Sequence, residues 1–197
     1  MAKNHFQMPV PVKITGRSSS LTNSFANAII PVIPPTEAEI EEVLSILGMD
    51  KESVRCAYCG DVATEWDHFR PLIKNKRPTG FISEIGNLVP ACGKCNQSKG
   101  NKDWRIWINS DAVLSPKRRN VSNLDERIRR LEAFEHWRPI QPIDFETMVD
   151  EETWQAYWKR WQELRDILAV TQKLADEIRL AIGKAHQQIL REGTTIE

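Results

Sequence analysis

Two Cys-x-x-Cys pairs constrain the fold of this chain more than any other feature of its sequence. Cys56 and Cys59 form the first pair, Cys92 and Cys95 form the second, and no other cysteine occurs in the 197 residues. A Cys-x-x-Cys turn presents two thiolates to one ion, and zinc binds four thiolates in a tetrahedron. In a reducing compartment, paired cysteines are more often metal ligands than disulfides. The spacing therefore predicts one structural Zn²⁺ site that ties together the two ends of the segment between the pairs.

The charge of the chain is balanced in total but uneven along its length. There are 27 basic and 27 acidic residues, so the formal net charge is zero. The stretch from Lys51 to Arg119 holds thirteen basic and seven acidic residues, a net charge of +6, which leaves −6 for the two flanks. A basic window around a zinc site favours contact with phosphate groups. Since no long apolar run and no secretion leader is present, we expect a cytoplasmic protein that binds no membrane.

Composition, together with the positions of the Pro and Gly residues that end helices and strands, predicts an α+β, mostly helical chain of four segments. The segments are an extended N-terminal arm at 1–35, a helix leading into the core at 36–50, the core itself at 51–110, and a helical region with a candidate dimer seam at 111–197. Pro, Ser and Asn dominate the arm. Thr36 and Glu39 have the spacing of a capping box, which predicts that a helix begins there and runs to about Leu47.

Helical periodicity continues after the core. Helices are predicted at residues 102–109, 123–137 and 151–191. The last carries a heptad, with Trp154, Trp161, Leu168, Ala175, Ile182 and Ile189 in one row and Tyr157, Leu164, Thr171, Ile178 and Ala185 in the other. About forty residues of unbroken helix would be about 60 Å long, more than one small domain can bury. Two interpretations stay open: a seam that makes a homodimer, or shorter helices, broken near Val170 or Gly183, that pack on the chain's own core.

Between the cysteine pairs, the sequence alternates as strands do. Residues 63–68 read as a strand that ends in Asp67 and His68, because Arg70 and Pro71 follow at once. Adjacent strand residues point to opposite faces, so these two side chains can serve one site only if the strand ends or turns there. Residues 86–90 are short enough for a second strand, and the polar run at 96–100 suits the start of a helix.

The order of these motifs resembles the zinc-bearing branch of the HNH nucleases. The shared pattern is Cys-x-x-Cys, Asp-His-x-x-Pro, Asn-Leu-x-Pro and Cys-x-x-Cys-Asn-x-x-Lys-Gly, over about a quarter of the chain. The resemblance implies a ββα-metal fold in which His68 is the general base and Asp67 binds a divalent metal. It implies further that Asn87 braces the loop and orients His68, and that Asn96 is the second metal ligand in place of the family's third histidine.

These residue types suit phosphodiester hydrolysis on chemical grounds as well. A neutral histidine can take a proton from water near neutral pH. A carboxylate and an amide oxygen suit a hard cation such as Mg²⁺, which also accepts phosphate oxygens. Candidate nucleic-acid contacts are basic residues in or near the window and one in the N-terminal arm, namely Arg17, Arg70, Lys94, Lys99, Lys102, Lys117, Arg118 and Arg119.

The sequence thus predicts a metal-dependent DNA endonuclease with a structural Zn²⁺ and a catalytic Mg²⁺ or another divalent cation. Double-stranded DNA is the expected substrate, and a restriction-type or other anti-phage role is favoured, with a homodimer cutting two strands. One alternative is a nicking or phage-packaging HNH nuclease within a larger complex. Another is a zinc-containing module that binds DNA without cutting it, although mere binding needs neither Asp67 nor His68.

Overall fold

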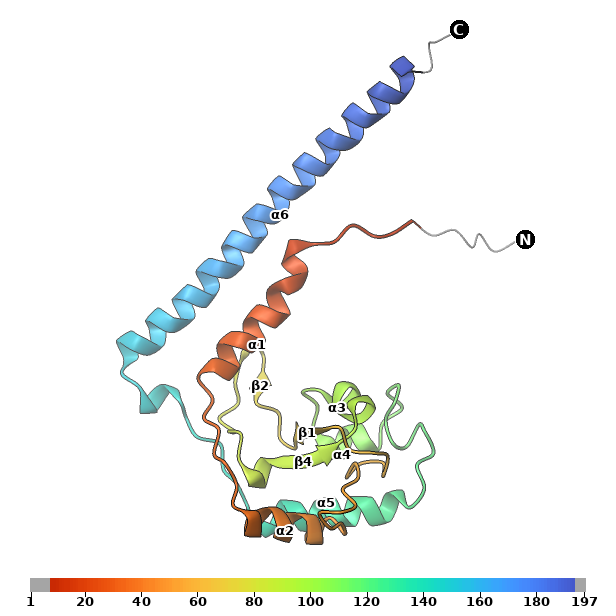
Figure 1. Cartoon of the computed structure of the whole chain (residues 1–197). Helices are drawn as coiled ribbons and strands as arrows, with labels where there is room; N and C mark the ends of the chain where they lie inside the picture. The colour runs from red at the N-terminus through yellow and green to blue at the C-terminus, as the bar shows by residue number, and fades with distance from the viewer. Residues whose placement is uncertain (1–7, 194–197) are drawn as a thin grey trace, which may run out of the picture. The chain divides into compact units, whose positions relative to one another are not determined.

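The structure is a computed structural model and describes residues 8–193 (Figure 1). Residues 26–148 form one compact unit, and residues 8–25 together with 149–193 form another. This division differs from the four predicted segments, because the N-terminal stretch shares a unit with the C-terminal helix instead of standing alone as an arm. Within the described residues, no helix is both long enough and apolar enough to cross a membrane.

A two-stranded antiparallel sheet lies at the centre of the larger unit. β1 (Glu65–His68) pairs with β4 (Leu88–Ala91), so that Asp67 lies opposite Val89 and His68 opposite Leu88. The connection contains a small hairpin of β2 (Ile73–Lys74) and β3 (Arg77–Pro78) and the 3₁₀ turn η2 (Ile85–Asn87). Helix α3 (Gly93–Lys99) follows β4 directly. The predicted α+β fold with a ββα core is therefore confirmed, with α3 beginning three residues before the predicted polar run.

Three further helices enclose this core. In Figure 1, α2 (Glu37–Ile46) and α5 (Leu124–Trp137) run side by side below the sheet, and α4 (Trp104–Ile108) follows α3. Thr36 caps α2 through the predicted capping box with Glu39. Five of the six largest fully buried side chains are aromatic, namely Trp104, Trp107, Tyr58, Phe69 and Phe134. Because the sheet has only two strands, these helices supply most of the apolar surface that holds the unit together.

A smaller apolar cluster supports the hairpin of β2 and β3. Ala26, Ile30, Leu72 and Ile73 are buried in it, and Phe145 packs against it just before the 3₁₀ turn η3 (Glu146–Met148). The carbonyl of Gly80 accepts a hydrogen bond from the backbone N–H of Ile143. The long loop between β1 and β4 is thereby fixed at its far end.

The other unit consists of the 3₁₀ turn η1 (Ile14–Arg17), helix α1 (Ser18–Ala28) up to Phe25, and helix α6 (Glu151–Gly193). Within the arm predicted at residues 1–35, residues 18–28 are helical instead of extended, and residues 1–7 lie outside the described residues. This helix packs on α6: the indole of Trp161 donates to Thr22 Oγ1 at 3.2 Å, and the Tyr157 hydroxyl donates to the Phe25 carbonyl at 2.8 Å. Because these contacts join residues more than 130 positions apart, local sequence alone does not reveal the helix.

Helix α6 is unbroken over 43 residues, so neither Val170 nor Gly183 interrupts it. From Trp154 to Ala175 the first predicted heptad row is at least partly buried within its unit. The second row differs from the prediction after Tyr157, which is partly buried: Leu164, Thr171, Ile178 and Ala185 are exposed, while Trp158, Arg165 and Gln172, one position further along, are at least partly buried. The side-chain amide oxygen of Gln172, Oε1, accepts from the backbone N–H of Ile14 at 2.6 Å. The first half of α6 therefore packs within its own chain.

Candidate functional site

The four cysteines meet at one point in the structure. Cys56 and Cys59 lie in the turn before β1, Cys92 caps α3 and Cys95 lies in its first turn. All four sulfurs lie within 4.8 Å of one another, and Cys59 Sγ is 3.6 Å from Cys92 Sγ. A tetrahedron with Zn–S bonds of about 2.3 Å has S–S edges of about 3.8 Å. The cluster therefore fits the predicted four-thiolate zinc site, which pins the segment before β1 to α3.

Arg119 completes this cluster. Its Nη2 donates to Cys95 Sγ at 3.1 Å, its Nη1 lies 3.6 Å from Asp61 Oδ2, and its Nε is buried without a hydrogen-bond partner among the described residues. Hydrogen bonds from Cys56 and Cys95 hold the pKa of Cys59 far below its ordinary value. The hydrogen bond between Cys56 and Cys59 in turn raises the pKa of Cys56 to about 12. Arg119 is among the predicted nucleic-acid contacts, and in the structure its side chain is only 19% exposed and donates to Cys95 Sγ.

His68 ends strand β1. Its Nε2 forms a hydrogen bond with Ser83 Oγ at 2.8 Å, and its ring is partly buried. Burial lowers the pKa of His68, and the charge of Lys99 lowers it further. The imidazole is therefore neutral at neutral pH and able to accept a proton, as a general base requires.

Asn87 joins the two ends of the loop that follows His68. Its side chain is fully buried, and its Oδ1 accepts from the backbone N–H of Arg70 at 2.7 Å. Its Nδ2 donates to the carbonyls of Arg70 and Ile82, both at 3.1 Å. These bonds fix the backbone at Arg70, two positions after His68, and at Ile82, which precedes the Ser83 that contacts the His68 ring. The geometry supports the expected bracing, while an effect on catalysis stays a prediction.

Asp67 lies in a buried ionic cluster. The residue is 4% exposed, and its Oδ2 accepts from the Tyr58 hydroxyl at 2.6 Å and lies 3.0 Å from Lys99 Nζ. Burial raises the pKa of Asp67, and the charge of Lys99 and the hydrogen bond from Tyr58 oppose that rise. Lys99 is fully buried and its ammonium is already paired with Asp67, an arrangement that does not favour the predicted contact with nucleic acid.

Asn96 lies on α3 next to a carboxylate that the sequence analysis did not single out. Its Nδ2 donates to Glu65 Oε2 at 2.7 Å, which leaves the amide oxygen for another ligand. Glu65 is exposed, and it is two positions before Asp67 on β1, so both carboxylates face the same side of the strand. The charge of Glu65 also raises the pKa of Asp67. In the sequence, the alternation of Glu65 and Asp67 before His68 is the pattern that indicates Glu65 as a further carboxylate of the site.

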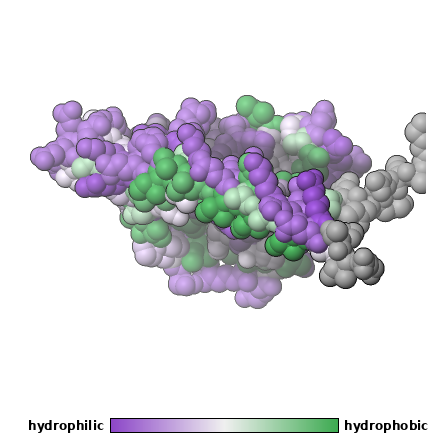
Figure 2. Space-filling model, turned by 90° about the horizontal axis from the view of Figure 1, so that it is seen from above, coloured by the Kyte–Doolittle hydropathy of each residue, from purple (hydrophilic) through white to green (hydrophobic). Residues whose placement is uncertain are grey.

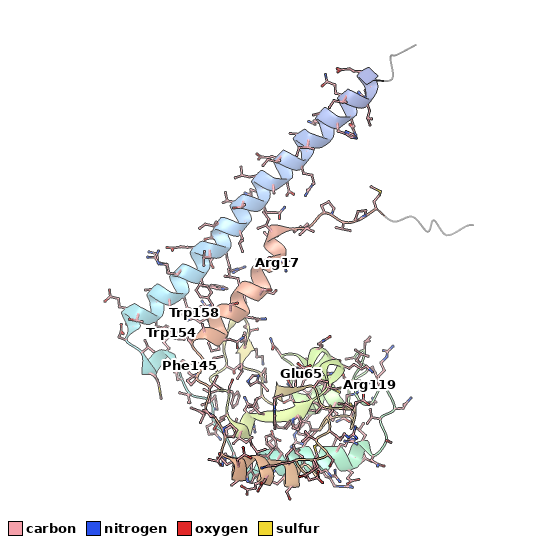
Figure 3. The ribbon with its side chains drawn as sticks, in the orientation of Figure 1. Arg17, Glu65, Arg119, Phe145, Trp154 and Trp158 are labelled. Atoms are coloured by element: carbon pink, nitrogen blue, oxygen red, sulfur yellow. The ribbon has the colours of Figure 1, made fainter. Side chains whose placement is uncertain are left out.

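Figure 3 shows Glu65 beside α3 and Arg119 on the later loop. Glu65, Asp67 and Asn96 offer two carboxylates and one amide oxygen, the donors that a hard divalent cation prefers. An open pocket of about 540 Å³ lies beside the cysteine cluster and is lined in part by Thr64, Cys92, Gly93 and Lys94. Lys94 is exposed on α3.

The other predicted nucleic-acid contacts have different surroundings. Arg70 is paired with Glu135 and its side chain is only 19% exposed, so its predicted phosphate contact stays a prediction. Lys102 donates to the Ser98 carbonyl at the end of α3, and Arg118 donates to the Asp111 carbonyl. Lys117 is exposed and weakly paired with Asp111, and Arg17 is exposed in the other unit.

The fold and the site together define a ββα domain with a four-cysteine cluster that could hold a metal such as zinc, and comparison with known proteins indicates a nuclease. Residues 56–102 match the model of the HNH endonuclease family and form an HNH endonuclease domain. The chain is also similar to the CRISPR-associated endonuclease Cas9 of Corynebacterium diphtheriae, with 27% identity over 166 residues. That alignment covers 82% of this chain and 14% of the Cas9 chain. No solved structure matches the chain. The family match and this relative support a nuclease.

Proposed function

We propose that this chain is a metal-dependent endonuclease that hydrolyses phosphodiester bonds in double-stranded DNA. The observation that carries the proposal is the HNH match at residues 56–102, which includes a partly buried His68 whose pKa is lowered. In the proposed mechanism, His68 takes a proton from the attacking water, and Ser83 Oγ holds the ring. The products would carry a 5′-phosphate and a 3′-hydroxyl.

Asp67 and Asn96 would hold a divalent cation such as Mg²⁺, and Glu65 adds a further oxygen beside Asn96. When bound, the cation supplies positive charge to the phosphate and to the leaving oxygen. Lys99 and Tyr58 orient the Asp67 carboxylate through Oδ2. The four cysteines would hold a structural Zn²⁺, which has no open position for chemistry when four thiolates bind it. Exposed Lys94, Lys117 and Arg118 are the proposed phosphate contacts in this unit.

A plasmid assay tests this proposal. Purified protein should cut plasmid DNA in the presence of Mg²⁺ or Mn²⁺, and His68→Ala should lower the rate by about 10²- to 10⁴-fold, the usual contribution of a general base. His136→Ala is the matched control, since this exposed histidine on α5 should leave the rate unchanged. Zinc content should be equal in all three proteins. Undiminished cutting by His68→Ala would overturn the mechanism, and no cutting by wild type with any divalent metal would favour a non-catalytic DNA-binding module.

A restriction-type or other anti-phage role is our proposal for the biology, with two copies cutting two strands. Sequencing the ends of fragments from a defined plasmid tests it. Ends clustered at one short palindromic sequence are expected. Single-strand nicks scattered over the plasmid would instead support the nicking alternative.

A further inference from the structure

Helix α6 has a second apolar face, which is separate from the face that packs within its own unit. We define the outer stripe as seven residues that are each 41–65% exposed: Leu164, Ile167, Val170, Leu174, Ile178, Ile182 and Ile189. At 3.6 residues per turn these positions share one side of the helix, about 100° around the axis from the buried row of Trp161 and Leu168. Figure 2 shows hydrophobic residues, in green, interrupting the hydrophilic surface.

The outer stripe is too long and too continuous to be incidental. It runs from Leu164 to Ile189, about 37 Å along the helix. From residue 176 to residue 193, every side chain of α6 is exposed. A helix in water gains most of its stability from packing its apolar face, so this half of α6 requires a covering surface.

We propose that the outer stripe packs against the same stripe of a second copy of this chain, with the two α6 helices antiparallel. The middle of the stripe is complementary to itself in size when the two-fold axis passes between residues 179 and 180. Ile178 then lies opposite the partner's Ala181, and Leu174 lies opposite the partner's Ala185. Large side chains face small ones in these layers, as close packing of two helices requires.

The charges beside the stripe favour the same arrangement. Glu163 and Glu177 flank its first part, and Lys184 flanks its last part. In the antiparallel register, Glu177 lies opposite Lys184 of the partner subunit, and symmetry repeats the pair. In a parallel pair, a residue that flanks the seam lies beside the partner residue five positions further along the chain. Glu177 would then lie beside the partner's Ile182 instead of a lysine. Opposite charges therefore meet only in the antiparallel dimer.

This interface does not rest on the proposed nuclease function, and its test does not measure DNA cleavage. The full chain has a mass of 22.7 kDa, so sedimentation of a dimer should give twice 22.7 kDa. Wild type should sediment as a dimer at micromolar concentration. Ile178→Lys, which places a charge in the centre of the stripe, should raise the dissociation constant by about tenfold or more.

Leu180→Lys is the matched control. Leu180 is on the same helix and 60% exposed, but it lies on the side away from the outer stripe, so the dimer should persist. Circular dichroism should show equal helix content in both variants. A monomeric wild type at tens of micromolar would overturn the proposal, as would equal disruption by Leu180→Lys.

Charge exchange tests the orientation. Glu177→Lys alone and Lys184→Glu alone should each weaken the dimer, because each puts like charges opposite one another. The double variant carrying Glu177→Lys and Lys184→Glu should restore wild-type dimerisation. If the double variant is no tighter than the single variants, the antiparallel register is wrong.

Discussion

The ammonium of Lys99 lies 3.0 Å from Asp67 Oδ2, and neither side chain is more than 5% exposed. The same ammonium donates to the His68 carbonyl at 2.7 Å. One buried cation on α3 therefore holds two consecutive residues of β1, the proposed metal ligand and the proposed base. Tyr58 completes the cluster by donating to the same carboxylate oxygen of Asp67.

Replacing Lys99 with methionine should strongly destabilise the larger unit. The change leaves the Asp67 carboxylate buried with only Tyr58 as a partner, and breaking a buried pair in this way costs about 3–5 kcal/mol. The free energy of unfolding from denaturant titration measures the effect. Lys94→Met, an exposed change on the same helix, should shift it by less than about 0.5 kcal/mol. A small loss for Lys99→Met would show that water reaches Asp67.

This cluster shows what could and what could not be predicted from the sequence. The cysteine spacing predicted the metal cluster, the capping box of Thr36 and Glu39 predicted the start of α2, and the motif order predicted the ββα core, because each is a local pattern. The burial of Lys99 depends on Tyr58 and Asp67, which reach it only in the folded chain. Lysine is usually exposed, so its sequence position favoured a phosphate contact.

The same distinction explains the errors outside the site. Helix α1 depends on Tyr157 and Trp161 of α6, and Arg119 faces the thiols because its loop folds back on Cys95. The heptad period alone did not show which of two adjacent rows of α6 is buried, since the residues of the two rows differ by only one position. Long-range packing decided each of these points.

Asn87→Ala should destabilise the loop between β1 and β4. It removes three hydrogen bonds and leaves the backbone N–H of Arg70 buried without its acceptor, which costs about 1–3 kcal/mol. Thermal unfolding should show the loss. Asn109→Ala is the comparison, because that exposed side chain makes one local bond to the Arg105 carbonyl. Equal melting temperatures for the two variants would contradict the bracing role.

Arg119→Met should weaken metal retention by the four cysteines. The guanidinium donates to Cys95 Sγ and places a positive charge beside the thiolates, and loss of such partners typically lowers metal affinity about 10- to 100-fold. Competition with a zinc chelator measures the change. Arg118→Met is the neighbouring control, since Arg118 contacts the Asp111 carbonyl instead. Identical chelator curves for both variants would argue against a role for Arg119 at the cluster.

The pH dependence of cleavage should report the neutral form of His68. Burial and the charge of Lys99 lower the pKa of His68 below its ordinary 6.5, so the rate should be half-maximal below that pH and rise with pH. The same shift makes the stability of the fold depend on pH. The unfolded chain binds more protons on the His68 imidazole than the folded chain does, so the contribution of His68 to the free energy of unfolding is lost as pH falls below 6.5. The pH dependence of stability should therefore be weaker in His68→Ala. An acid limb above pH 6.5 would contradict the assignment.

Glu65→Gln should weaken divalent-metal binding without destabilising the fold. Glu65 is exposed, so its neutral isostere changes little in packing, but it removes a carboxylate that lies 2.7 Å from Asn96 Nδ2. Electron paramagnetic resonance of added Mn²⁺ measures binding in the absence of DNA, and the affinity should fall by about tenfold or more. Glu52→Gln, another exposed carboxylate of the same unit, should bind Mn²⁺ as wild type does. If Glu65→Gln also binds as wild type while Asp67→Asn does not, Asp67 and Asn96 alone hold the cation, and Glu65 serves only to orient the Asn96 amide.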